Sequence, residues 1–177
     1  MLLRTTIGDK SIQWLKGQLG LEGWDTGLRR QPRGQIYFQG NTTGSDFDET
    51  YSSVGVTYTL DTSSAIQFAV ADNVKLKYTG SASRWFNVIG TVDVEHGSSN
   101  AVEVSIKLAK NGVAIDASQC NGTIAGNGGV AKLHTMWILP LEKDDTLEIF
   151  ISAPGVVSPA TETLTPKRSR LQATCLS

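Results

Sequence analysis

Residues 102–118 read VEVSIKLAKNGVAIDAS, and this stretch indicates the fold class. Every even position from Val102 to Leu108 is apolar, whereas the odd positions between them are glutamate, serine and lysine. Because alternate side chains of a β-strand point to opposite faces, this pattern predicts a half-buried strand with one dry and one wet side.

The centre of the same stretch predicts a tight turn. Asn111-Gly112 is the preferred pair for a two-residue type I′ loop, because both central residues need positive φ. If Lys110 pairs with Val113, the apolar row continues from Leu108 across the turn to Ile115. We therefore expect a β-hairpin with one face against a core.

The rest of the chain from residue 35 shows the same two-residue period. Polar, glycine-rich turns such as His96-Gly-Ser-Ser-Asn separate the segments. Many short, evenly spaced strands with almost no helix predict an antiparallel β-sandwich or barrel. The other expected strands span residues 35–38, 54–60, 65–70, 74–79, 85–96, 130–141, 146–152 and 170–176.

Composition limits the classes of function. The 177 residues suit one domain with an appendage, and the formal net charge is only −1, so no electrostatic footprint for nucleic acid is present. The most basic cluster, Lys167-Arg168 with Arg170, is more typical of a solvated strand edge than of a nucleic-acid contact.

Location and redox state follow from two further features. No run of about 18 apolar residues is present, so we expect no membrane span. The N-terminal sequence MLLRTTIGDK is too short in apolar length for a secretory signal, so we expect the protein to be made in the cytoplasm and to stay there until it is released. Cys120 and Cys175 match no metal-ligand spacing, and we expect reduced thiols, with a disulfide between the two as the alternative.

Residues 1–33 differ from the rest and are predicted to form an N-terminal arm, with the domain spanning 34–177. Ile12, Leu15 and Leu19 have helical spacing, but glycines interrupt it, so the arm holds at most one short helix. Its apolar residues should dock either on its own domain or on a partner. The candidate docking residues are Trp14, Leu15, Leu19, Leu21, Trp24 and Leu28.

Catalytic chemistry is not expected. His96 sits beside Gly97 at a predicted turn, and His134 lies on the even row of a predicted strand, and neither has a ligand partner at metal spacing. Asp46, Asp48 and Glu49 resemble a fragment of a cation site, but the calcium-loop spacing is missing, which favours a solvated acidic loop. We predict no enzyme activity, no cofactor and no metal.

The order of segments in the last hundred residues resembles a known family. The hairpin with its KNG turn, then LHTMWILPL, the turn EKDD, LEIFI and RLQATCL are similar to the second half of the tumour necrosis factor and complement globular-head jelly roll. Lys143-Asp144 stand where the family often has Gly-Asp. The glycine- and threonine-rich strands and the closing TETLTPKRSRLQATCL look most like virion proteins of tailed bacteriophages. The resemblance covers roughly residues 60–176.

The resemblance implies a homotrimer, in which each copy buries one sheet against its neighbours. Strands 130–141 and 146–152 support this independently, because they carry apolar residues on both faces and so need a second buried surface. Cover by loops or by the arm is the alternative. The candidate trimer-interface residues are His134, Met136, Ile138 and Phe150.

The leading hypothesis is a capsid decoration or cement protein of a phage. It would assemble in the host cytoplasm, sit on the capsid surface, and use its arm to hold the major capsid protein or other virion proteins. One alternative is a head-fibre or tail-fibre tip that binds a host receptor, glycan or protein, which exposed Trp85 or Tyr78 would favour. A second is a cellular ligand-like or lectin-like binding domain.

Overall fold

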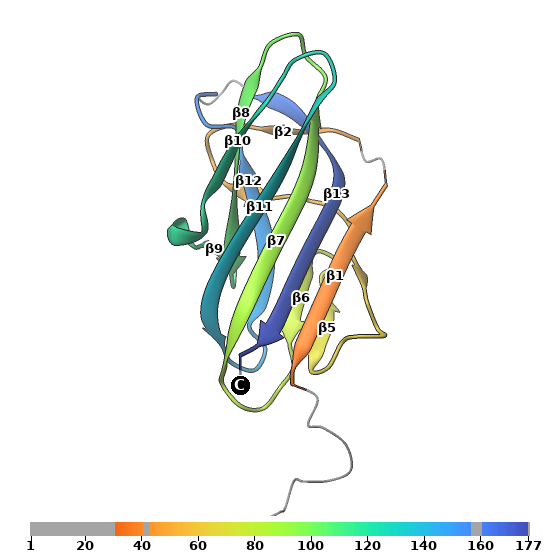
Figure 1. The fold of residues 1–177 in the computed structure, drawn as a ribbon, viewed down its shortest axis with the longest axis vertical. Coiled ribbons are helices and arrows are strands. Elements are labelled where there is room, and N and C mark those ends of the chain that lie inside the picture. The colour runs from red at the N-terminus through yellow and green to blue at the C-terminus, as the bar shows by residue number, and fades with distance from the viewer. Residues whose placement is uncertain (1–30, 41–42, 157–160, 177) are drawn as a thin grey trace, which may run out of the picture. The chain divides into compact units, whose positions relative to one another are not determined.

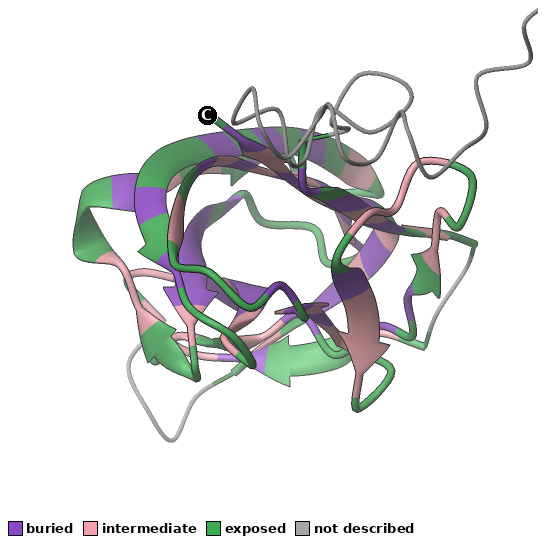
Figure 2. Ribbon diagram, turned by 90° about the horizontal axis from the view of Figure 1, so that it is seen from below, coloured by how far each residue is buried: buried purple, intermediate pink, exposed green. Residues whose placement is uncertain are grey.

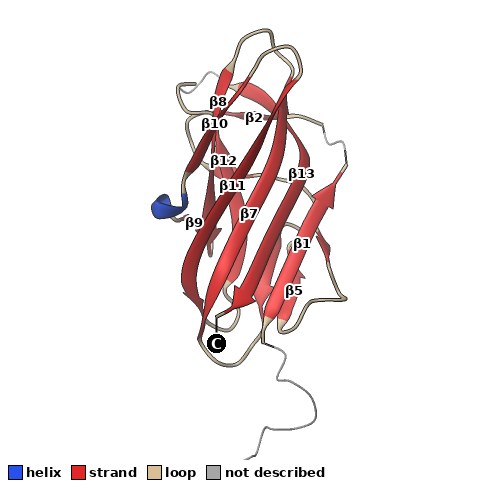
Figure 3. Cartoon of the chain, viewed as in Figure 1, coloured by secondary structure: helices blue, strands red, loops and turns tan. Residues whose placement is uncertain are grey.

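The computed structural model of the chain describes residues 31–40, 43–156 and 161–176. In these residues two antiparallel β-sheets pack face to face, and one hydrophobic core fills the space between them (Figure 1). Helical structure in this part of the chain is limited to one short 3-10 turn, η1 (Asp116–Ser118) (Figure 3). The predicted all-β sandwich is therefore confirmed.

The sheet nearer the viewer in Figure 1 is called the front sheet. Its strand order is β11-β7-β13-β1-β4, and β2 pairs with the beginning of β13. The strands are β11 (Gly129–Leu141), β7 (Arg84–His96), β13 (Glu162–Cys175), β1 (Arg33–Gln39), β4 (Thr59–Leu60) and β2 (Ser45–Phe47).

The back sheet has the strand order β10-β8-β12-β6-β5, with β9 paired to β8 and β3 paired to β12. The strands are β10 (Cys120–Ile124), β8 (Val102–Lys110), β12 (Thr146–Ser152), β6 (Lys75–Tyr78), β5 (Phe68–Ala71), β9 (Val113–Ala114) and β3 (Ser52–Ser53). Sheet neighbours such as β1 and β13 lie far apart in sequence, so the chain crosses repeatedly between the sheets, as in a jelly roll.

The long strands of the front sheet alternate between core and surface. In β7, every even position from Phe86 to His96 is buried and the odd positions are more exposed. Figure 2 shows the same alternation as stripes of buried and exposed residues along the ribbons. The alternation gives this sheet a dry inner face and an outer face that strands β11, β7, β13 and β1 share.

The hairpin from β8 to β9 matches the sequence prediction. Asn111 and Gly112 have φ of 52° and 78°, and Lys110 pairs with Val113. The even row from Val102 to Leu108 is buried in the core. The expectation that the odd row is wet is wrong for part of it, because Ser105 and Lys107 are buried on the outer face of the back sheet.

The Asn111 turn is tied to the polar turn that precedes β12. Asn111 donates through Nδ2 to Asp145 Oδ1 at 2.6 Å, and its Oδ1 accepts from the Thr146 amide at 2.8 Å. Lys110 forms an ion pair with Asp145 Oδ2 at 2.8 Å. The KNG and EKDD segments, read from the sequence as separate turns, thus form one interlocked end of the sandwich.

Several strand bounds differ from the prediction. Of the expected strand 54–60 only β4 is regular, because this segment passes from the back sheet to the front sheet: the Val54 amide bonds to Ile149 in β12, and Thr59 pairs with Tyr37 in β1. Strand β13 begins eight residues before the expected strand at Arg170. Strands β10, β2 and β3 were not predicted.

Candidate functional site

The outer face of the front sheet carries a cluster of exposed apolar side chains. Trp85, Met136 and Ile138 are each about half exposed, at 56%, 53% and 50%. The ladder aligns Met136 with Ile89, and the Leu176 amide donates to the Trp85 carbonyl, so these side chains lie on neighbouring strands. We call Trp85, Ile89, Met136, Ile138 and Leu176 the apolar patch.

The patch is large enough to need an explanation. Four of its side chains are about half exposed and Ile89 is partly exposed, so together they offer an apolar area on the order of a few hundred Å², a size at which a patch on a monomer is often functional. It occupies the part of the face near the end of β13, where the chain also enters β1 (Figure 1).

The predicted trimer-interface residues do not all share this face. His134, Met136 and Ile138 lie on the outward row of β11, as their even spacing predicted. Phe150 belongs to β12 in the back sheet, where it is half-buried opposite Lys107 and Ser53. A single interface through the front sheet therefore contains the first three residues but not Phe150.

Trp137 adds an apolar group that the alternation did not predict to be exposed. It belongs to the inward row of β11, yet 39% of it is exposed. Strand β11 is the last strand of the front sheet, so the inner side of Trp137 opens at the edge between the two sheets. The edge of β11 thus offers apolar surface beside Ile138 on the outer face.

The other part of the outer face is polar and positively charged. The ladders place His134, Thr91, Arg170 and Tyr37 side by side across the four strands. Although the whole chain has a net charge of −1, this face has more cations than carboxylates. The cationic side chains are Arg33, Lys132, Lys167, Arg168 and Arg170, and the carboxylates are Asp93 and Glu95.

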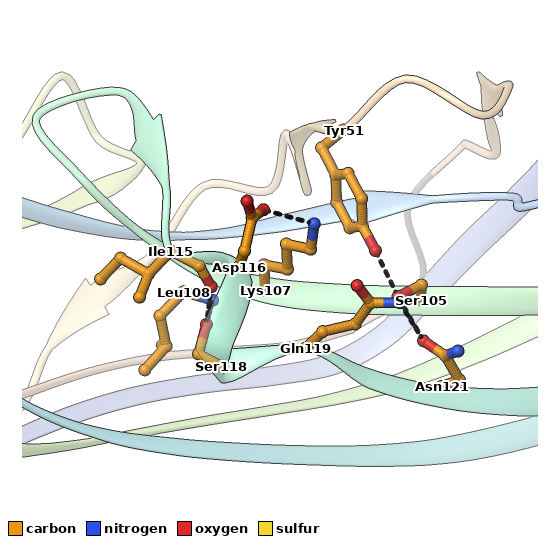
Figure 4. A network of polar contacts seen from close by, with 9 residues as sticks. All are labelled: Tyr51, Ser105, Lys107, Leu108, Ile115, Asp116, Ser118, Gln119 and Asn121. Carbon is orange, nitrogen blue, oxygen red and sulfur yellow. Dashed lines mark hydrogen bonds and ion pairs between the residues drawn. The ribbon is translucent and has the colours of Figure 1, made fainter.

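The outer face of the back sheet carries a connected polar network, drawn in Figure 4. The Tyr51 hydroxyl lies 2.5 Å from Ser105 Oγ, and Ser105 donates to Asn121 Oδ1 at 2.7 Å. Lys107 Nζ lies 2.8 Å from Asp116 Oδ1 and 4.0 Å from the centre of the Tyr51 ring. These contacts explain why the odd row of β8 is not wet: Tyr51, 54 residues away from Ser105, reaches over it.

The network is structural in character. The hydrogen bond that Lys107 donates to the Asp116 carboxylate is the main reason why the pKa of Lys107 is raised, and it outweighs the opposing effect of burial. Ser118 accepts from the Leu108 amide and donates to the Ile115 carbonyl, which holds η1 against β8. The polar groups of this network thus form hydrogen bonds with one another, and they hold the segments that contain Tyr51 and η1 against the back sheet.

Glu148 is a second buried charge on the back sheet. It is only 4% exposed, and burial raises the pKa of its carboxyl despite the Lys75 ammonium at 3.9 Å. Glu148 lies on the same row of TLEIFIS as Phe150, and its own burial was not predicted from the sequence.

The two histidines considered for catalysis lie in different environments, one buried and one exposed. His96, expected in a turn, is the last residue of β7, and its buried Nε2 lies 2.9 Å from Glu162 Oε2 in β13. His134 is on the exposed outer face. Among the described residues, no three His, Cys, Asp or Glu side chains are grouped so that they could hold a metal ion.

The acidic loop has local structural contacts. Asp46 accepts a hydrogen bond from the Thr163 hydroxyl at 2.6 Å, and Asp48 accepts one from the Thr50 amide at 2.7 Å. In the described part of the chain both cysteines are free, with Cys175 buried and Cys120 half-buried. The helical structure described has neither the length nor the apolar character to cross a bilayer.

Residues 1–30 of the predicted arm lie outside the described part of the chain, so the docking role of residues 1–33 stays a prediction, as does the domain boundary between residues 33 and 34. The affected docking candidates are Trp14, Leu15, Leu19, Leu21, Trp24 and Leu28.

Comparison with known proteins identifies the fold. No family model matches the chain, and no curated protein matches it. Among solved structures, the Eiger TNF from S. frugiperda is similar, with a TM-score of 0.50 and 14% sequence identity over 83% of this chain and 94% of that chain. The protein is therefore a TNF-like jelly-roll sandwich, and at this identity the likeness defines the fold alone.

Proposed function

We propose that the protein is a non-enzymatic structural component of a phage particle, a homotrimeric jelly roll that decorates the capsid. The observation that supports a homotrimer is the apolar patch on the outer face of the front sheet. The resemblance of residues 60–176 to virion proteins of tailed bacteriophages supports a role in a phage particle.

A second copy of the chain is the occupant that best fits the patch. A stable interface usually buries about 800 Å² per partner, more than the patch provides alone. The exposed edge at Trp137 supplies further apolar area, and it differs from the face in position, because Trp137 belongs to the inward row of the edge strand β11. Two different surfaces on one copy are what a closed ring of head-to-tail contacts needs, because each copy contacts one neighbour through its apolar patch and the other through its β11 edge.

The charges of the face favour the same arrangement. A two-fold contact would place the face against itself, so the guanidinium groups of Arg168 and Arg170 would meet their own counterparts. A face-to-edge contact avoids this opposition. The three-fold ring therefore fits the distribution of charge better than a two-fold dimer.

The attachment role belongs to the arm. Burial of its tryptophan and leucine side chains against capsid subunits would contribute roughly 25 cal/mol per Å² of apolar area. Three linked copies would strengthen the attachment further, because the second and third arms bind at high effective concentration.

Deletion of residues 1–33 tests the decoration role. The expected product keeps the oligomeric state of the full chain but no longer binds purified capsids in co-sedimentation. A truncated protein that binds capsids as well as the full chain would contradict the proposal, and so would a full chain that binds host cells but not capsids.

The receptor-binding alternative gains little from the aromatic residues that would have favoured it. Tyr78 is buried, with its hydroxyl donating to the Ala82 carbonyl at 2.9 Å. Trp85 is exposed, but it belongs to the apolar patch. In the capsid-binding experiment, a full chain that binds host cells but not capsids would favour the receptor-binding alternative.

A further inference from the structure

A hollow on the polar part of the front sheet has the composition of a ligand site. It is an open hollow of about 260 Å³ on the outer face of β1, β13 and β7, and it borders the apolar patch along β7, where Thr91 is the next outward position after Ile89. Two consecutive outward positions of β13, Arg168 and Arg170, form its floor, with β1 on one side and β7 on the other. The lining residues are Tyr37, Phe38, Gln39, Thr91, Asp93, Arg168, Ser169 and Arg170.

Arg170 is positioned without being neutralised. Its Nη2 donates to Gln35 Oε1 at 2.5 Å and to Gln172 Oε1 at 2.9 Å. Both acceptors are neutral amides, so no carboxylate neutralises the guanidinium in these two bonds, and three of its five N–H donors have no partner among the described residues. A guanidinium fixed in this way matches the planar fork that binds carboxylate or phosphate.

Arg168 provides a second guanidinium one row further along the strand. Its Cα partner on β7 is Asp93, yet within the described residues no carboxylate lies within 4.0 Å of Arg168. The hollow therefore contains two cationic forks on the same side of one strand, and neither forms an ion pair with another described side chain.

The walls of the hollow supply groups for uncharged polar partners. Tyr37 is exposed and adds an aromatic ring and a hydroxyl on β1, beside the amide of Gln39. On the β7 side, the Thr91 hydroxyl can donate or accept, and the Asp93 carboxylate can accept from hydroxyl groups. An anion without hydroxyl groups would leave Asp93 unfavourably close and unused.

We propose that this hollow binds a small hydroxylated oxyanion, of the sugar-acid or sugar-phosphate class. The two guanidinium groups hold the acidic group, Asp93, Thr91 and Gln39 contact the hydroxyls, and the Tyr37 ring covers one face of the sugar. The volume is just below the range of pockets for drug-sized ligands, which fits a single sugar unit.

The binding experiment uses the full-length protein and isothermal titration at constant ionic strength. The probes are glucuronate, glucose 6-phosphate, inorganic phosphate and glucose. Binding of glucuronate or glucose 6-phosphate supports the proposal, and which of the two binds more tightly identifies the acidic group. Inorganic phosphate is expected to bind more weakly, because it lacks the sugar hydroxyls, and glucose is expected not to bind measurably.

Matched variants distinguish this site from general attraction to a positive face. Arg168→Gln and Arg170→Gln should each weaken binding about tenfold or more, because each removes charged hydrogen bonds to the ligand. Lys132→Gln removes the same charge from the same face outside the hollow and should leave affinity within about twofold. Circular dichroism spectra and unfolding curves confirm that each variant is folded.

Three results would overturn the proposal: no binding of either sugar anion by the folded protein, an equal loss in Lys132→Gln, or glucose binding as tight as glucuronate. The mass of each sample is measured by sedimentation in the same buffers. A monomeric protein that binds glucuronate would refute the trimer and keep this site, so the two proposals can fail separately.

Discussion

The interlocked turns at Asn111 give the sharpest test of the fold. Asn111 does two things: its backbone occupies positive φ, at 52°, and its side chain bonds to Asp145 and Thr146. Asn111→Gly keeps the backbone conformation at no steric cost and removes the side-chain bonds. Asn111→Ala removes the same bonds but keeps a Cβ in the left-handed region, which alanine tolerates less well than asparagine or glycine.

The two variants should differ by a defined amount. Each lost hydrogen bond contributes about 0.5–1.5 kcal/mol net, so Asn111→Gly should lower the free energy of unfolding by about 1–3 kcal/mol. Asn111→Ala should lose about 1 kcal/mol more, because an L residue with a Cβ is strained at positive φ. The measurement is urea unfolding with linear extrapolation.

Asn127→Gly is the matched control. Asn127 also has positive φ, at 61°, and is also followed by glycine, but its side chain has no hydrogen bond to another described residue. Its replacement should change stability by less than about 0.5 kcal/mol. If Asn111→Gly lowers the free energy of unfolding no more than Asn127→Gly does, the side-chain hydrogen bonds of Asn111 do not stabilise the fold and the reasoning is refuted.

Three further substitutions test packing and buried charge. Gly34→Ala should lose about 1–3 kcal/mol in urea unfolding, because its Cβ would lie 2.4 Å from the Phe68 ring, whereas Gly97→Ala has open space and should be mild; equal losses would contradict this packing. Glu148→Gln should raise stability at pH 7 but not at pH 4. Because the pKa of Glu148 is raised in the folded state, its carboxyl favours the fold while it is protonated, and this contribution is lost as pH rises above the ordinary value of 4.5. A gain in stability for Glu148→Gln at both pH values would contradict this prediction. Asp145→Asn should show the opposite trend. Burial alone would raise the pKa of Asp145, but the hydrogen bonds from the Glu142 amide, Lys110 and Asn111 together outweigh it, so the pKa lies below the ordinary value of 3.8. The loss of unfolding free energy in Asp145→Asn should therefore be full at pH 7 and should shrink as pH falls below 3.8. A loss of stability that does not depend on pH would refute this prediction.

The strands with clear alternation were predictable from the sequence. Strands β7, β8 and β11 follow the two-residue period, and Asn111-Gly112 gave the turn and its register. These features depend on neighbours in sequence, so the sequence alone contains the signal.

The missed strands have features that usually interrupt strands. Pro166 stands inside β13, and the register shifts between Pro166 and Arg168, so a bulge accommodates a residue that cannot donate to the ladder. Asn121-Gly122 looks like a turn but lies in β10, where a Cβ on Gly122 would come within 2.7 Å of the Leu133 side chain. In both places tertiary pairing overrides the local preference.

The candidate surface was only partly predictable for a related reason. Alternation shows that His134 and Phe150 both point away from the core row of their own strands, but it does not show which sheet each strand joins. The burial of Lys107 under Tyr51 is equally invisible locally, because it depends on a contact between distant segments. Arg168 and Arg170 could be noticed in the sequence as a basic cluster, whereas the hollow around them required the fold.

The most direct test of the central claim is the mass of the full-length protein by analytical ultracentrifugation at micromolar concentration. The apolar patch as the contact between copies in a three-fold ring predicts three times the 19.0 kDa chain mass. It also predicts folded monomers for Met136→Lys, which places a charge in the patch. The control Val113→Lys, at an exposed position on β9 in the back sheet, should remain trimeric. A monomeric wild-type protein, or a Met136→Lys variant that stays trimeric, would contradict the claim.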